Sequence, residues 1–275
     1  MGEFDTYIGR SRESTDVLDP WRASALAALL GRNQTFREGN SLPILWQWAF
    51  FLPVVSPELS GEDGHPRRGD FLPPISLQRR MFAGGRTQLR APLNVGVPAR
   101  RIETIARIEK KDGRNGPMVL VTVSHRYEQK GALCIEEEQS YIYLDPQTGA
   151  DIQADTQPIP EAVLSSSFVA DAVTLFRFSA LTYNGHRIHY DRPYATGEEG
   201  YPDLVVHGPL TAMMLAGLAE TDRGPLSSLT FRARKPLFRG KPVALRGVPG
   251  ESGNVYLTAF DEAGAVTMTA EASRS

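Results

Sequence analysis

The apolar positions of the chain follow helical spacing in two places, one in each half. The first run is WRASALAALL and the second is PLTAMMLAGLAET. Asp19 is the predicted N-cap of the first run, Pro20 suits its first turn, and Gly31 is a natural stop. The stripe in TAMMLAGLA is best explained as the buried face of a central helix. The sequence therefore predicts one helix in each half.

Long runs with the alternation of β-strands follow each helix. In the first half they are RTQLRAPL, ARRIETIARIEKKDG, PMVLVTVSHRYEQKG and ALCIEEEQSYIYLD; in the second they are SSLTFRARKPLF, KPVALRGVPG, NVYLTAFDEAG and AVTMTAEASR. A polar, proline-containing stretch between residues 145 and 167 is the predicted linker. We therefore expect two copies of one α+β module, at residues 1–150 and 167–275. A sheet wrapped around one helix in each module is a double hot dog fold.

Composition and charge argue against several classes of partner. The formal net charge is only -2 and the charged residues are interspersed, so neither nucleic acid nor an anionic membrane surface is expected to bind. Cys134 is the single cysteine, which excludes an intrachain disulfide, and its apolar surroundings favour ordinary packing. The N-terminus lacks the pattern of a signal peptide, and no run of about 18 apolar residues occurs. We expect a cytoplasmic protein.

The candidate chemistry lies in FSALTYNGHRIHYDRPYA, residues 178–195, and in the LVVHGPLTAMMLAGLA that follows. His189 offers an imidazole, the side chain whose ordinary pKa suits proton exchange near neutral pH. The predicted helix beginning at Gly208-Pro209 offers free backbone N–H groups and the positive end of its dipole. Together they suit a reaction that moves a proton and develops negative charge on a carbonyl oxygen.

These stretches resemble the MaoC-like or R-specific enoyl-CoA hydratase family, whose loop has the form S-G-D-x-N-P-I-H-x-D ahead of an H-G-x-L step into the central helix. The resemblance is closer to the branch of type 2 3-hydroxyacyl-thioester dehydratases and mesaconyl- or itaconyl-CoA hydratases. That branch has loops similar to TYNGHRIHYD and, in its first half, stretches similar to LPILWQWAFFLP, GHPRRGDFLPP and RRMFAGGR. The resemblance covers most of the chain and implies the hot dog fold.

The resemblance assigns roles residue by residue. His189 falls on the family's catalytic histidine, and Gly208 on the glycine whose N–H faces the thioester carbonyl. Asn184 stands where most of the family has a catalytic aspartate, and an amide cannot take up a proton at neutral pH. We therefore expect His189 to transfer the proton and Asn184 to hold the water or the leaving hydroxyl. His186 and Arg187 replace the family's asparagine and proline.

Several neighbours of these residues have a structural interpretation beside the functional one. His207, just before the helix, is expected to support the site rather than to react. Asp191 is expected to cap a turn that fixes the loop. Tyr183 is a candidate to contact substrate, although it and Tyr190 could equally serve only in packing.

Basic residues are expected near the phosphates of a CoA or carrier-protein thioester. The candidates, for each of which a solvated strand face is the alternative, are Arg79, Arg80, Arg86, Arg232, Arg234 and Lys235. The free carboxylate of a dicarboxylic acyl group would need a cation, either Arg187 or Arg86. The segment LWQWAFF and the loop of residues 61–74 are expected to cover the acyl group. No loop of the catalytic type occurs in the first half, which we therefore expect to set specificity.

The sequence thus predicts a cofactor-independent acyl-thioester hydratase or dehydratase, with mesaconyl- or itaconyl-CoA among its substrates. No metal is expected, because the five histidines lack spacing such as H-E-x-x-H. A 3-hydroxyacyl-carrier-protein dehydratase of fatty acid synthesis is an alternative. A thioesterase would need a carboxylate near the central helix, which has none until Glu220. Asn184 leaves open a non-catalytic acyl-thioester-binding protein, and a homodimer is also left open.

Overall fold

The computed structural model describes residues 3–113, 116–145, 158–250 and 253–274. The strands of these residues form one antiparallel sheet in the order β1-β3-β4-β5-β2-β7-β10-β9-β8-β6. The first half contributes β1 (Ser11–Val17), β2 (Arg79–Leu89), β3 (Pro98–Gly113), β4 (Gly116–Gln129) and β5 (Ala132–Leu144). The second contributes β6 (Leu164–Val169), β7 (Ser228–Ala233), β8 (Pro242–Pro249), β9 (Val255–Phe260) and β10 (Val266–Ser273).

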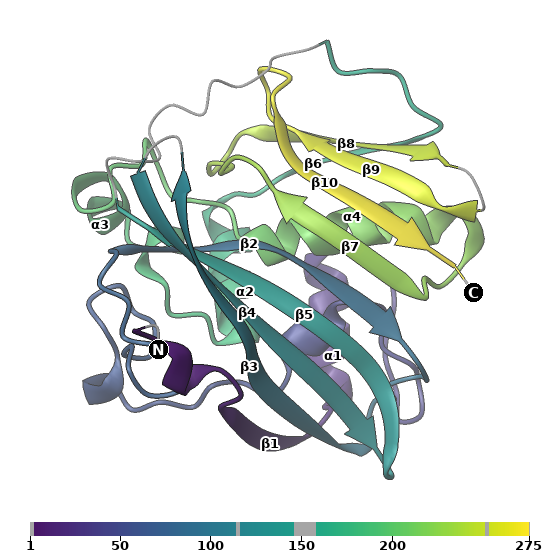
Figure 1. The fold of residues 1–275 in the computed structure, drawn as a ribbon. Coiled ribbons are helices and arrows are strands. Elements are labelled where there is room, and N and C mark those ends of the chain that lie inside the picture. Colours follow the sequence, from purple (N-terminus) through teal and green to yellow (C-terminus); the bar gives the residue numbers. More distant parts are fainter. Residues whose placement is uncertain (1–2, 114–115, 146–157, 251–252, 275) are drawn as a thin grey trace.

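The two halves join where β2 pairs with β7, near the middle of the sheet (Figure 1). Gly84 makes this joint close, because a Cβ atom there would lie 2.4 Å from the carbonyl oxygen of Phe231. The pairing of β2 with β5 also shifts register between Phe82 and Gly84. A glycine is therefore needed where β2 meets strands of both halves.

The sheet of the second half curves around α4 (Gly208–Arg223), which contacts all five of its strands (Figure 1). Apolar side chains such as Leu215 and Ala219 of this helix are fully buried. The helix of the first half, α1 (Pro20–Leu29), instead packs against α2 (Ala172–Thr182) and the 3-10 helix η2 (Trp46–Ala49). Among the described helices, none is both long and apolar enough to cross a bilayer.

The elements confirm the two predicted helices and most predicted strands. Asp19 caps α1 as expected, since its carboxylate accepts a hydrogen bond of 2.9 Å from the backbone N of Trp21. The predicted linker is wrong at its end, because β6 begins at Leu164 and pairs with β8. Residues 146–157 of that linker lie outside the described residues, and the division into modules stays a prediction.

Three short helices complete the part of the fold that positions the site. They are η3 (Pro57–Leu59) in the first half, and η5 (Arg187–His189) and α3 (Arg192–Gly197) in the second. The segment that carries η5 follows α2 directly, and α3 follows η5 after two residues. The sequence analysis did not predict α2, although this helix leads directly into the segment that carries η5 and His189.

Candidate active site

His189 lies buried at the end of η5, with 7% of its surface exposed. Its Nδ1 is 2.7 Å from the carbonyl oxygen of Val205, so Nδ1 carries the hydrogen and donates it. The Nε2 atom therefore has its lone pair free. Burial, with a smaller contribution from His186, lowers the pKa of His189 to about 3. The imidazole is neutral at physiological pH and is able to accept a proton.

His207 supports the ring of His189 from one side. The two rings stack with their centroids 3.6 Å apart and their planes 21° apart. The Nε2 of His207 is 2.9 Å from Oγ of Ser179 on α2, and Phe178 packs against the same ring at 4.8 Å. His207 is fully buried, and burial holds its pKa well below the ordinary value. The neutral ring of His207 thus holds the ring of His189 in one plane.

Gly208 begins α4 directly after His207 and lies on the wall of the cavity that His189 also lines. The first N–H groups of a helix have no partner within the helix, and the dipole adds positive potential there. A Cβ atom at Gly208 would lie 3.7 Å from the ring of Phe82. A side chain here would narrow the space beside these N–H groups, whereas glycine leaves them accessible to a ligand oxygen.

Asn184 lies on the same cavity wall, two residues after α2 ends. Its Oδ1 accepts a hydrogen bond of 3.0 Å from the backbone N of His186. Because the oxygen is used within the loop, the Nδ2 group of Asn184 is the one oriented for donation. The side chain of His186 is buried and lies 3.8 Å from the carboxylate of Glu199, which also pairs with Arg79 at 3.4 Å.

His189, Asn184 and Gly208 line a cavity of about 1380 Å³ that extends into the first half. There its wall includes a group of polar side chains, here called the first-half chamber, of which all but the partly buried Arg101 are buried: Arg101, Glu103, His125, Tyr127 and Gln139. Within the described part of the chain, no hydrogen-bond partner reaches either ring nitrogen of His125 or the Nε of Arg101. Burial lowers the pKa of His125, so its ring is neutral.

The charges of the first-half chamber are held by ion pairs and hydrogen bonds. Arg101 lies 2.9 Å from Glu103, and His125 lies 3.6 Å from the same carboxylate. Behind the chamber, Glu137 accepts hydrogen bonds from Trp48 at 2.6 Å and from Tyr127 at 3.1 Å. The sequence analysis did not single out these residues, because they alternate along strands in the ordinary way.

The predicted substrate-binding residues fall into two groups. Those on the cavity wall are Arg79, Arg80, Tyr183, Arg232, Arg234 and Lys235. Arg187 is not among the lining residues; its guanidinium pairs with Asp191 at 2.7 Å and donates to the carbonyl oxygen of Glu62 at 3.1 Å. Arg86 is exposed on β2, also outside the lining. Asp191 caps α3 by accepting from the backbone N of Tyr194.

Residues 61–66 form a loop of the first half, which we call the first-half loop. This loop packs directly on the loop that carries His189. The backbone N of Arg187 donates to the carbonyl oxygen of Asp63 at 2.9 Å. A Cβ atom on Gly64 would lie 1.9 Å from the carbonyl oxygen of Gly185, so the two backbones touch. The sequence pointed to this segment through its similarity to the GHPRRGDFLPP stretch of the branch and as part of the loop of residues 61–74 expected to cover the acyl group.

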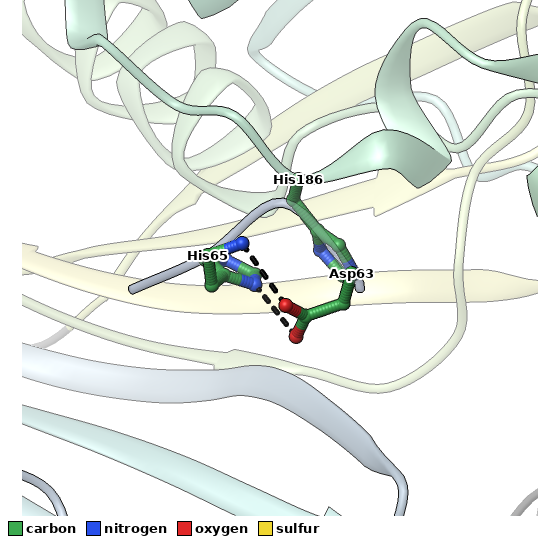
Figure 2. A group of neighbouring side chains, drawn as sticks. All are labelled: Asp63, His65 and His186. Atoms are coloured by element: carbon green, nitrogen blue, oxygen red, sulfur yellow. Dashed lines mark hydrogen bonds and ion pairs between the residues drawn. The ribbon is translucent and has the colours of Figure 1, made fainter. Parts of the chain in front are cut away.

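Asp63 and His65 of this loop lie beside His186 (Figure 2). Each of the three offers a ligand atom within 4.8 Å of the others, so the group could hold a metal ion. The carboxylate of Asp63, however, already accepts from the Nδ1 of His65 at 3.1 Å and from its backbone N at 3.0 Å. After burial, the positive charge of Arg80 is the largest influence that lowers the pKa of His65. A nearby cation works against binding a second one.

Comparisons with known proteins place this geometry in a family. Residues 45–239 match the model of the family "Hydroxyacyl-thioester dehydratase type 2". The Mesaconyl-C(4)-CoA hydratase of Chloroflexus aurantiacus is 45% identical over 273 residues, which are 96% of each chain. The crystal structure of HtdX of Mycobacterium tuberculosis matches 97% of this chain and 100% of its own, with a TM-score of 0.71 and 20% identity.

A further structure from Mycobacterium tuberculosis, described as having a double hotdog fold, covers 96% of this chain and 95% of its own, with a TM-score of 0.60 and 12% identity. At these identities the two structures bear on the fold alone, and they confirm the predicted α+β double hot dog. The family match and the 45% identical relative confirm the resemblance found in the sequence. The chain belongs to the hydroxyacyl-thioester dehydratase type 2 family and is a hydro-lyase.

Proposed function

We propose that the chain adds water reversibly across the 2,3 double bond of an enoyl-CoA whose acyl group is a short branched dicarboxylate, such as mesaconyl- or itaconyl-CoA. The observation that carries the proposal is that His189, Asn184 and Gly208 line one cavity. The name of the 45% identical relative, Mesaconyl-C(4)-CoA hydratase, supports a CoA thioester and this acyl class.

The geometry suits the following steps. In hydration, Nε2 of His189 takes a proton from water while the water oxygen bonds to C3. The electrons of the double bond move to C2 and the thioester oxygen, where the N–H of Gly208 and the dipole of α4 stabilise the negative charge. His189 then delivers the same proton to C2 and returns to its neutral form. Asn184 holds the water oxygen by donating from Nδ2, and dehydration reverses each step.

The first-half chamber is the proposed site for the free carboxylate of the acyl group. The Nε of Arg101 and the ring nitrogens of His125 have no hydrogen-bond partner among the described residues, although another nitrogen of Arg101 pairs with Glu103 at 2.9 Å. A buried polar atom without a partner is costly unless a ligand pairs with it. Arg187, a candidate from sequence, lies outside the cavity lining, whereas Arg101 and His125 belong to it. We therefore assign recognition of the carboxylate to Arg101 and His125.

The phosphates of CoA are assigned to the cavity rim. Arg232 and Arg234 are exposed there at the end of β7 and just beyond it. One guanidinium group can donate two parallel hydrogen bonds to the oxygens of a phosphate. Even solvated arginines therefore contribute to binding a nucleotide. Lys235 is paired with Asp261 at 2.9 Å and is less available.

The test is a panel of crotonyl-, mesaconyl-C4- and itaconyl-CoA, with loss of the enoyl-thioester absorbance as the readout. We expect the dicarboxylic thioesters to give the highest kcat/KM. His189→Ala should lower kcat by about 10²–10⁴-fold without loss of thermal stability. Arg107→Ala, which removes an exposed ion pair with Glu138, is the control and should match the wild type.

Other results would favour other functions. Release of free CoA would indicate a thioesterase, for which the carboxylate of Glu220 is poorly suited because Arg32 binds it at 2.7 Å. Turnover of carrier-protein thioesters alone would indicate a dehydratase of fatty acid synthesis, and binding without turnover a non-catalytic protein. A cytoplasmic location and a homodimer stay predictions.

A further inference from the structure

The residues assigned so far to the reacting water, His189 and Asn184, leave its second hydrogen without a dedicated acceptor. His189 has one free lone pair, on Nε2, and uses it for the proton that is transferred. The oxygen of Asn184 already accepts from the backbone N of His186, which holds that oxygen within the loop. A water molecule is oriented well only when both of its hydrogens have acceptors. A further acceptor on the cavity wall would therefore complete the orientation of the water.

His65 of the first-half loop meets this need. It lines the same cavity as His189 and Asn184. Its ring lies 4.2 Å from that of His186, which in turn lies 5.5 Å from that of His189. About a fifth of the side chain of His65 is exposed, so water reaches it, in contrast to the fully buried His207.

The hydrogen bonds of His65 decide which of its nitrogens is free. The carboxylate of Asp63 accepts from Nδ1 at 3.1 Å, and an ionised carboxylate only accepts (Figure 2). Nδ1 thus carries the hydrogen and Nε2 the lone pair. Burial opposes the charge on Asp63, yet its hydrogen bonds to His65 lower the net pKa and keep it ionised. Burial and the charge of Arg80 keep the ring of His65 neutral.

The first-half loop is held rigidly enough for this role. It turns tightly, since Gly61 donates to the carbonyl oxygen of His65 at 2.7 Å and Gly64 donates to that of Gly61 at 3.0 Å. Two hydrogen bonds from Arg187, one from its backbone and one from its guanidinium, tie the loop to the catalytic loop. A residue of the first half is thereby fixed against the catalytic residues of the second.

We propose that His65, oriented by Asp63, is a further catalytic residue: its Nε2 accepts a hydrogen bond from the water that adds to C3. This inference rests on the proposed hydration. Water loses one proton to Nε2 of His189 as its oxygen bonds to C3, and that proton passes to C2. The second hydrogen stays on the oxygen, bonded to His65, and becomes the hydrogen of the product hydroxyl. Nothing beyond water and the enoyl thioester is consumed.

The first test compares kcat, KM and thermal stability of the wild type with those of His65→Ala and Asp63→Asn. Alanine removes the acceptor. Asparagine donates to Nδ1, which turns the imidazole to the tautomer whose Nε2 carries hydrogen and cannot accept. Both variants should lower kcat by about 10²-fold while KM stays within a few fold. Glu62→Ala, an exposed residue of the same loop, is the matched control and should retain activity.

The second test is rescue. An aspartate at position 184 would supply a carboxylate acceptor beside the water. Asn184→Asp should therefore raise the kcat of His65→Ala at least tenfold more than it raises the kcat of the wild type, which a merely structural role of His65 would not allow. A kcat for His65→Ala within threefold of the wild type, or a loss that Asn184→Asp leaves unchanged, would overturn the inference.

Two further outcomes separate this inference from its rivals. If dialysis against a chelator abolishes wild-type activity and Zn²⁺ restores it, the group in Figure 2 is a metal site and His65 is a ligand rather than a water acceptor. If the wild type turns over none of the enoyl-CoA panel, the proposed function itself fails. Normal wild-type turnover with fully active His65 variants refutes only the role of His65.

Discussion

Gly64 occupies the tightest contact between the two halves of the active site. Its φ of +85° is in the left-handed region, and a Cβ atom there would lie 1.9 Å from the carbonyl oxygen of Gly185 and 2.9 Å from its carbon. Both neighbours are backbone atoms, which cannot rotate away as a side chain can. Gly64→Ala must therefore separate the first-half loop from the catalytic loop.

The size of the effect follows from these distances. An ordinary contact begins near 3.4 Å, so the loops must part by about 1.5 Å from their present 1.9 Å. A misplacement of about 1 Å in an active site can cost about 10²-fold in rate, and we expect a fall of that order in kcat/KM. The left-handed conformation adds about 1–2 kcal/mol of destabilisation. Each kcal/mol corresponds to a decrease in Tm of about 2–4 °C.

Gly131→Ala separates these two effects. Gly131 has a φ of +78°, close to that of Gly64, but a Cβ atom there would meet nothing within 4 Å. Gly131→Ala should lose only the thermal stability that the left-handed conformation costs, and Gly64→Ala at least as much, whereas only Gly64→Ala should lose hydration of enoyl-CoA. Equal kcat/KM values for the two variants would refute the claim that this contact positions the site.

Three other expectations follow from the structure. His125→Ala or Arg101→Ala should reduce kcat/KM for mesaconyl-C4-CoA more than for crotonyl-CoA, and equal losses would argue against a carboxylate site. Asp19→Ala removes the cap of α1 and should cost about 1 kcal/mol in urea unfolding, with little effect on turnover. The unfolded chain binds protons at its histidines near pH 6.5, but burial lowers the pKa of His189 to about 3 and that of His207 well below 6.5. Because the unfolded state then binds more protons, stability should decrease as pH falls below about 6.5, and Tm measured from about pH 7.5 to about pH 5 should show this.

Local signals explain which elements the sequence could predict. The cap at Asp19 and the apolar spacing of α4 each depend on a few neighbouring residues, and both α1 and α4 occur where the sequence predicts them. β1 carries no such signal: among the described strands SRESTDV pairs with β3 alone, and most of its side chains are exposed. α2 did leave a signal that was missed, since Asp171 accepts from the backbone N of Thr174 at 2.7 Å, three residues on. The apolar run after this cap, with Leu175 and Phe178 buried, completes the pattern of a helix.

The residues of the active site also differ in whether neighbouring sequence or only the fold identifies them. His189, Asn184 and Gly208 belong to two motifs close together in the sequence, so a family resemblance identifies them. His65 reaches the site only because a loop more than a hundred residues earlier packs on the catalytic loop. His125 lies on β4, whose alternating apolar and polar residues are typical of a strand with one face in the core. Only the fold reveals that this face borders a cavity.

The first half contributes more than specificity if the site works as proposed. Its loop supplies His65 beside the water, and its strands supply Arg101 and His125 around the acyl group. The second half by itself would keep His189 and the N-terminus of α4, but it would lack the water acceptor and would leave the edge of β7 unpaired at the position of Gly84. Since the pairing of β2 with β7 and the contact of the two loops fix both sets of residues together, the relative position of the halves is itself a determinant of catalysis.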